Sequence, residues 1–212
     1  MRNVRLFYQK KGNAKYISHL DMNRFMMRAV KRSGVPVWYT EGFNPHPFIT
    51  FTMPLSLGFE TNYDSIEFKI EGEMTNEEIA ERFRNVFPAT MPVIGVKDCV
   101  LKSKELKYAS FTITLQAADR EAINAYFEKD EIIVSKKTKK GTINQIDIKE
   151  KIHNLSLTEN GALRLYMVLP AGSEENLNPA VILDAMKLQA VQFTIVGISR
   201  NELLDKDFNL FE

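Results

Sequence analysis

The sequence predicts an α+β protein built from two tandem ferredoxin-like domains, each with the order strand, helix, strand, strand, helix, strand. Three observations support this fold class. Alternating apolar and polar residues mark strands, capping residues precede apolar stripes of helical spacing, and the same order of elements occurs twice. With 212 residues, 44% of them hydrophobic, the chain is long enough for two domains with one core each.

The first domain is expected to span residues 1–101. Residues 3–12 alternate and end in glycine, as a strand does. A helix is expected over residues 18–34, because Ser18 can cap its start and Gly34 can end it. The remaining elements are expected as strands over residues 35–40, 48–59, 64–72 and 91–100 (the middle two as one bent strand or a hairpin) and as a helix over 75–88.

The second domain is expected over residues 107–200, after a short polar linker. Here the same order of elements returns, with an insertion at residues 138–161 between the two middle strands. The acidic tail, residues 201–212, either docks on the domains or stays mobile. The expected strands are 108–116, 131–137, 162–170 and 191–199, and the expected helices are 119–130 and 178–187.

The net charge of +1 hides an uneven distribution. Residues 1–50 hold nine lysines and arginines against two acidic residues, a net +7, and residues 132–151 hold six against two, a net +4. Basic segments of this kind indicate an anionic partner, usually nucleic acid, or are solvated surfaces. A lysine-rich hairpin tip can also protect an exposed strand edge. The candidate nucleic-acid-binding residues are Lys31, Arg32, Lys136, Lys137, Lys139 and Lys140.

Composition narrows the chemistry. The single cysteine, Cys99, rules out an intramolecular disulfide and a cysteine-held cluster, and three histidines leave few ligands for zinc. We therefore expect no metal and no cofactor bound by this chain. No apolar run reaches the ~20 residues of a membrane span, and the charged N-terminus has no signal-peptide core. The expectation is a cytoplasmic protein that does not bind a membrane.

An unusual loop lies in residues 40–51, with the sequence TEGFNPHPFITF. Pro45 and Pro47 restrict their own φ angles and extend the residues before them, so His46 is held in a stiff loop. Such a loop either binds a ligand with little loss of entropy or merely connects two strands. His19, at the first turn of a helix, could accept a proton or could be an ordinary surface histidine. His19 and His46 are the candidate catalytic residues and are expected to share one cleft.

Strand alternation places Arg5, Phe7 and Trp38 on the sheet face opposite the helices. Aromatic residues on such a face stack RNA bases in RNA-recognition domains, but the glycine–aromatic signature of those domains is absent here. In the alternative interpretation, this face packs against the second domain.

Residues 16–59 resemble the uncharacterised bacterial proteins called radical-SAM-linked or radical-SAM-associated. The matching positions are Ser18-His19-Leu20-Asp21, Arg24, Arg28, Gly34, Pro36, Thr40, Gly42-Phe43-Asn44-Pro45-His46-Pro47, Thr50-Phe51, Pro54-Leu55 and Gly58. Residues 138–141, TKKG, and the Asp147-Ile148 pair match the family's pattern as well. The candidate substrate-binding residues are Ser18, His19, Asp21, Arg24, Arg28, Gly42, Phe43, Asn44, Pro45, His46 and Pro47.

Members of that family are fused to, or encoded beside, a radical S-adenosylmethionine protein with a cobalamin-binding-like region. The resemblance therefore implies such a protein as partner. Because this chain has no C-x-x-x-C-x-x-C motif, S-adenosylmethionine and the iron–sulfur cluster are expected only in the partner. We expect a non-catalytic accessory protein that recognises RNA or another anionic substrate for that enzyme.

The tandem layout is also similar to that of the metal-independent endoribonucleases that process CRISPR transcripts. His19, His46 and the arginines of the first helix could supply the base, the acid and the positive charge that such cleavage needs. Those enzymes usually carry a glycine-rich loop near the C-terminus, where this chain has only Gly197. A protein-interaction adaptor, which needs neither the histidines nor the basic residues, is the third interpretation.

Overall fold

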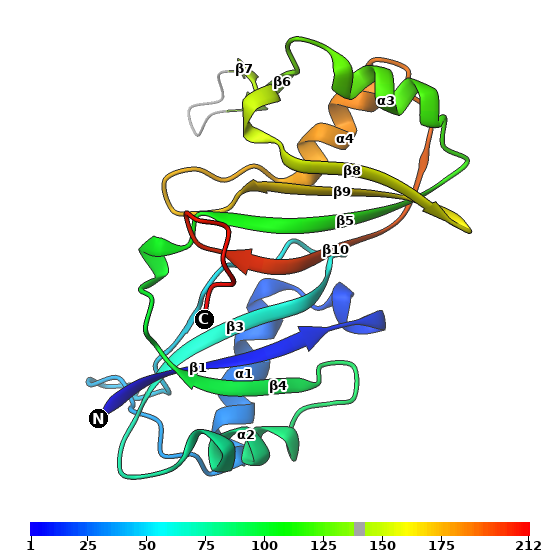
Figure 1. Ribbon diagram of the computed structural model, residues 1–212. Coiled ribbons are helices and arrows are strands. Elements are labelled where there is room, and N and C mark those ends of the chain that lie inside the picture. The colour runs from blue at the N-terminus through cyan, green and yellow to red at the C-terminus, as the bar shows by residue number, and fades with distance from the viewer. Residues whose placement is uncertain (138–142) are drawn as a thin grey trace.

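The computed structural model describes residues 1–137 and 143–212 and has a mixed α+β fold (Figure 1). One sheet has the strand order β4-β1-β3-β10-β5-β9-β8, with β2 paired to β3, and β6 and β7 form a separate hairpin. The elements are β1 Arg2–Lys10, η1 Gly12–Tyr16, α1 His19–Ser33, β2 Ile49–Phe51, β3 Glu60–Ile70, α2 Asn76–Arg84, β4 Val93–Asp98, η2 Ser103–Glu105, β5 Tyr108–Gln116, α3 Arg120–Glu128, β6 Ile133–Lys137, β7 Ile143–Asp147, η3 Lys149–Lys151, β8 His153–Asn160, β9 Ala162–Pro170, α4 Pro179–Leu188 and β10 Thr194–Leu204.

The N-terminal half places α1 and α2 against one face of an antiparallel sheet. Ser18 caps α1 as expected, and Gly34 ends it with a left-handed φ of 66° that a glycine adopts without strain. A capping box of Thr75 and Glu78 starts α2. The core of this half includes the inward residues of β1 and β3 and the apolar stripes of both helices: Val4, Leu6, Tyr8, Met22, Met26, Val30, Ile66, Phe68, Ile70, Ile79 and Phe83.

The C-terminal half has its own core. Strand β5 pairs antiparallel with both β10 and β9, and β9 pairs with β8. Helices α3 and α4 lie together on one side of this part of the sheet (Figure 1). Asn178 caps α4 and Pro179 is its first residue, as the sequence predicts. No helix within the described ranges is long and apolar enough to cross a membrane.

The two halves meet at β3 and β10, which run parallel and pair Glu60 with Ser199 and Thr61 with Arg200. The segment between β2 and β3 also crosses this junction. Its Phe59 belongs to the C-terminal core, and Met53 and Leu55 pack against that core. A segment of the N-terminal half is therefore held by the C-terminal half.

The strand expected over residues 35–40 is wrong. Val37 and Tyr39 form only isolated bridges, to Ile70 and Pro47, and β2 takes the position beside β3 instead. Pro36 has no N–H to donate and interrupts the ladder. At the end of β3, the Trp38 N–H donates to the Lys69 carbonyl oxygen and the Glu71 N–H donates to the Pro36 carbonyl oxygen. The regions expected as one bent strand or a hairpin are the antiparallel pair β2 and β3.

The expected second strand of the C-terminal sheet is also wrong. Within residues 131–137, Ile133–Lys137 form β6, which pairs with β7 outside the main sheet. The strand beside β9 is β8, which lies within the expected insertion of residues 138–161. Most of β8 is exposed, so it lacks the apolar alternation by which a strand is recognised in a sequence.

The C-terminal tail docks. Strand β10 continues to Leu204, and Phe211 is fully buried with its ring 4.2 Å from the guanidinium of Arg5. Phe7 stacks on Tyr63 with ring centroids 4.7 Å apart. Arg5 and Phe7 are therefore buried by the tail and by β3, and this face of the sheet offers them to no RNA base.

Candidate functional site

The S-H-L-D motif forms the start of α1. The Ser18 hydroxyl accepts a hydrogen bond from the Asp21 N–H at 3.2 Å and donates one to the Asp21 carboxylate at 2.8 Å. Both residues therefore serve the helix cap. His19 is exposed, and its ring meets the ring of Phe51 edge-on at a centroid distance of 5.0 Å.

The basic residues of α1 form a solvent-exposed row opposite its buried stripe. Arg24 is 3.1 Å from Asp21, but both side chains are about 60% exposed, so the ion pair contributes little stability. The hydrogen bond from Ser18 and then the one from Arg24 lower the pKa of Asp21 below its ordinary value. We call these residues the basic row: Arg24, Arg28, Lys31 and Arg32.

The G-F-N-P-H-P loop is closed by its own hydrogen bonds. Tyr39 bridges to Pro47, and the Thr40 N–H donates to the His46 carbonyl oxygen at 2.9 Å. The His46 N–H donates to the Thr40 hydroxyl at 3.2 Å, and the His46 Nδ1 lies 3.1 Å from that hydroxyl and 3.0 Å from the Asn44 carbonyl oxygen. Gly42 adopts a φ of 119°, which suits glycine alone. His46 therefore shapes the loop from within.

Phe43 is the most exposed large apolar side chain of the described residues. It is fully exposed at the tip of the loop, beside exposed Asn44 and Pro45, whereas Pro47 is buried at the base. Apolar rings normally avoid this position, because exposing them to water costs free energy. An exposed ring on a loop closed by its own hydrogen bonds is free to stack on a flat or apolar group.

The two candidate catalytic histidines have different surroundings. His19 packs against Phe51. His46 lies five residues before Phe51, inside the G-F-N-P-H-P loop. His46 is not among the residues that line the pocket beside His19. That the two histidines share one cleft stays a prediction.

The second basic segment lies partly outside the described residues. Lys136 and Lys137 belong to β6, and Lys139 and Lys140 fall in the range 138–142, which the structure does not describe. That these lysines and the basic row bind one strand of nucleic acid stays a prediction.

A buried ionic cluster lies at the junction of the halves. Tyr8 on β1 and Asp64 on β3 lie opposite each other in the sheet. The Asp64 carboxylate forms an ion pair with the guanidinium of Arg200, on β10, at 2.8 Å. The side chains of Arg200 and Asp64 are 1% and 3% exposed. Lys10 is also buried and donates to the Ile17 carbonyl oxygen at 3.1 Å. These four residues form the junction cluster: Tyr8, Lys10, Asp64 and Arg200.

The junction cluster reaches the surface beside His19. A narrow pocket of about 10 Å³, enough for about one water molecule, is lined by His19, Phe51 and Leu55 together with Tyr8, Lys10 and Asp64. Burial lowers the pKa of Lys10, and burial followed by the Asp64 charge raises the pKa of Tyr8. Burial also raises the pKa of Asp64, against the opposing effect of Arg200. Perturbed groups that share a cleft are typical of functional sites.

The junction cluster does not belong to any of the sequence motifs, but its residues occupy inward positions of the strands. Tyr8 and Lys10 continue the inward positions of β1, and Asp64 precedes the inward Ile66 on β3. A charged residue in the inward register of an apolar strand must find a partner inside the fold. The partner, Arg200, is distant in sequence and could not be named.

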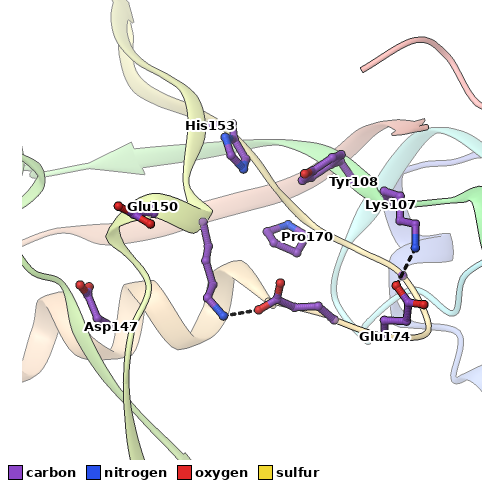
Figure 2. Close-up of a pocket in the computed structure, with 10 residues that line it drawn as sticks. Lys107, Tyr108, Asp147, Glu150, His153, Pro170 and Glu174 are labelled. Atoms are coloured by element: carbon purple, nitrogen blue, oxygen red, sulfur yellow. Dashed lines mark hydrogen bonds and ion pairs between the residues drawn. The ribbon is translucent and has the colours of Figure 1, made fainter. Parts of the chain in front are cut away.

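A second cavity, of about 570 Å³, lies in the C-terminal half (Figure 2). His153 meets Tyr108 edge-on at 5.3 Å on one wall. The charged residues that line it are Lys107, Asp147, Glu150, Lys151, Glu174 and Glu175. Carboxylates outnumber lysines, and both lysines are bound in ion pairs, to Glu174 and to Glu175. The charge of this cavity therefore does not favour an anion.

Comparison with known families supports the expected membership of an uncharacterised bacterial family. Residues 3–179 match a family described as uncharacterized proteins conserved in bacteria (DUF2344). The chain belongs to this family. A comparison with curated proteins gives no match.

The family match covers α1, the G-F-N-P-H-P loop and three of the four residues of the junction cluster. It ends at Pro179, the first residue of α4. Arg200, which completes the cluster, lies beyond it.

Proposed function

We propose that this protein is a non-catalytic accessory protein that recognises single-stranded RNA for a radical SAM enzyme. The observation that carries the proposal is the fully exposed ring of Phe43 on a loop closed by its own hydrogen bonds. A base stacked on an aromatic ring contributes about 1–3 kcal/mol of binding free energy. A loop that is already ordered loses little entropy when the base arrives.

The basic row supplies the second part of the proposal. Its side chains are exposed on α1, and the Arg24–Asp21 pair is weak enough to open for a phosphate. Lysines and arginines of this kind position a nucleic acid through its phosphates and carry no sequence information. In this proposal the loop selects the ligand and the basic row holds it.

The radical SAM partner is supported by the resemblance of residues 16–59 to proteins fused to, or encoded beside, such enzymes. S-adenosylmethionine, the iron–sulfur cluster and the cobalamin-binding-like region belong to the partner in this proposal. The single cysteine of this chain, Cys99, cannot hold a cluster.

We also infer that each half is a ferredoxin-like unit. The order β4-β1-β3-β2 in the first half and β10-β5-β9-β8 in the second support this, because both follow the same succession of strands and helices along the chain. The β6–β7 hairpin is then an insertion in the second unit. The domain limits 1–101 and 107–200 stay proposals, with the second extended to the end of β10 at Leu204.

The experiment is fluorescence anisotropy of a labelled short single-stranded RNA over a series of salt concentrations. Phe43→Ala should weaken binding by roughly 5- to 150-fold, the loss that corresponds to about 1–3 kcal/mol for one stacked base. The slope of log K against log salt should not change. Replacing Arg28 and Lys31 together with alanine should make that slope shallower by about 1.4.

Leu188→Ala is the matched control, because Leu188 is also a highly exposed apolar residue but lies at the end of α4. It should leave affinity and slope unchanged. Absence of RNA binding at low salt contradicts the proposal. If Phe43→Ala then prevents co-purification with the radical SAM protein, the protein is an adaptor. Metal-free cleavage of the RNA that is lost in His19→Ala would identify an endoribonuclease instead.

A further inference from the structure

Arg200 is the only residue of the C-terminal half in the junction cluster. It lies on β10, and its side chain is 1% exposed. A buried arginine costs free energy unless its donors are satisfied. Which groups satisfy the guanidinium therefore shows what the residue holds in place.

Among the described residues the guanidinium has three partners, all in the N-terminal half, and its buried Nε has none. Its Nη2 is 2.8 Å from the Asp64 carboxylate and donates to the Met53 carbonyl oxygen at 3.0 Å. Its Nη1 donates to the Pro54 carbonyl oxygen at 3.3 Å. One side chain thus fixes two successive carbonyl groups of an irregular segment against a strand.

That segment forms the wall of the His19 pocket. Phe51, two residues before Met53, meets the His19 ring edge-on, and Leu55, the residue after Pro54, lines the pocket. Met53 and Leu55 also pack against the C-terminal core. The positions of Phe51 and Leu55 relative to His19 therefore depend on where the C-terminal half holds residues 53 and 54.

We propose that Arg200 is a positioning residue for the His19 pocket and acts through the carbonyl groups of Met53 and Pro54. The site of the N-terminal half is then complete only when β10 is docked beside β3. The planar guanidinium is required because its donors point in several fixed directions, whereas a lysine ammonium is a single point charge. The inference concerns the geometry of the His19 pocket, and it can be tested without RNA.

The test is NMR of the histidine side chains in the full chain. The chain has three histidines, so the ring signals can be assigned with His→Gln variants. Arg200→Lys keeps the charge beside Asp64 but cannot also hold both carbonyl groups. The ring signal of His19 should shift, because the ring of Phe51 changes its position, and the signals of His46 and His153 should stay in place.

Two further variants separate positioning from stability. Pro54→Gly leaves Arg200 and Asp64 intact and changes an exposed residue. It increases the conformational freedom of the backbone in this segment. It should shift the His19 signal as Arg200→Lys does. Arg164→Lys, at an exposed position of β9, is the matched control and should shift no histidine signal.

An unmoved His19 signal in folded Arg200→Lys overturns the inference, even if the variant is less stable. If Arg200→Lys does not fold, Pro54→Gly decides, and an unmoved His19 signal again overturns it. The RNA titration is read separately. If the unaltered protein binds no RNA, the proposed function fails, and the histidine signals still show whether Arg200 positions the pocket.

Discussion

The ion pair between Arg200 and Asp64 allows a quantitative prediction of stability. Arg200→Met fills a similar volume but removes the charge and the donors, which leaves the Asp64 carboxylate buried without its cation. Removing one partner of a buried pair costs about 3–5 kcal/mol. Asp64 keeps the backbone N–H of Ser65 at 2.8 Å and the nearby Lys10, so we expect the lower part of this range. The freed carbonyls of Met53 and Pro54 add little, because both residues reach solvent.

The assay is thermal and urea unfolding followed by circular dichroism and by the fluorescence of the single tryptophan, Trp38. A loss of about 3–5 kcal/mol lowers the melting temperature of a chain of this length by roughly 6–20 °C. The double variant Asp64→Asn/Arg200→Met should recover about 2 kcal/mol of the loss, because no uncompensated charge then remains. A cost below about 1 kcal/mol, or a double variant no more stable than Arg200→Met, would refute this reasoning.

Three other predictions follow from single residues. Gly34→Ala should cost about 1 kcal/mol in urea unfolding because φ is 66° there, whereas Gly95→Ala, with ordinary φ and open space, should cost less. Phe211→Ala should cost about 3–5 kcal/mol, since the ring is fully buried; a loss under about 1 kcal/mol would show that the tail is not docked. Burial lowers the pKa of Lys10. At a pH between its folded and unfolded pKa, Lys10 therefore carries a proton in the unfolded chain and not in the folded protein. The free energy of unfolding should then rise with pH from the folded pKa to about 10.4, and Lys10→Met should lose this rise while Lys11→Met keeps it.

The candidate site was only partly predictable. The cap formed by Ser18 and Asp21 and the stiffness of the G-F-N-P-H-P loop follow from local chemistry, because their partners lie within a few residues. Whether His19 and His46 share a cleft does not, since it depends on which segment pairs with β3. The junction cluster was missed because its ion pair joins residues 64 and 200.

By itself the sequence determined the α+β class, the four α-helices of the described ranges and the strands with strong alternation, such as β1, β5 and β9. These depend on contacts within one element, where the spacing of apolar residues and the caps is decisive. Only the tertiary structure decided that β2 and β8 pair in the main sheet while β6 does not, and that the tail covers Arg5. It also decided that Arg200 donates to the carbonyl oxygens of Met53 and Pro54. The physical reason is that short or exposed strands and buried charges take their partners from distant parts of the chain, and the free energy of those contacts exists only once both halves are folded.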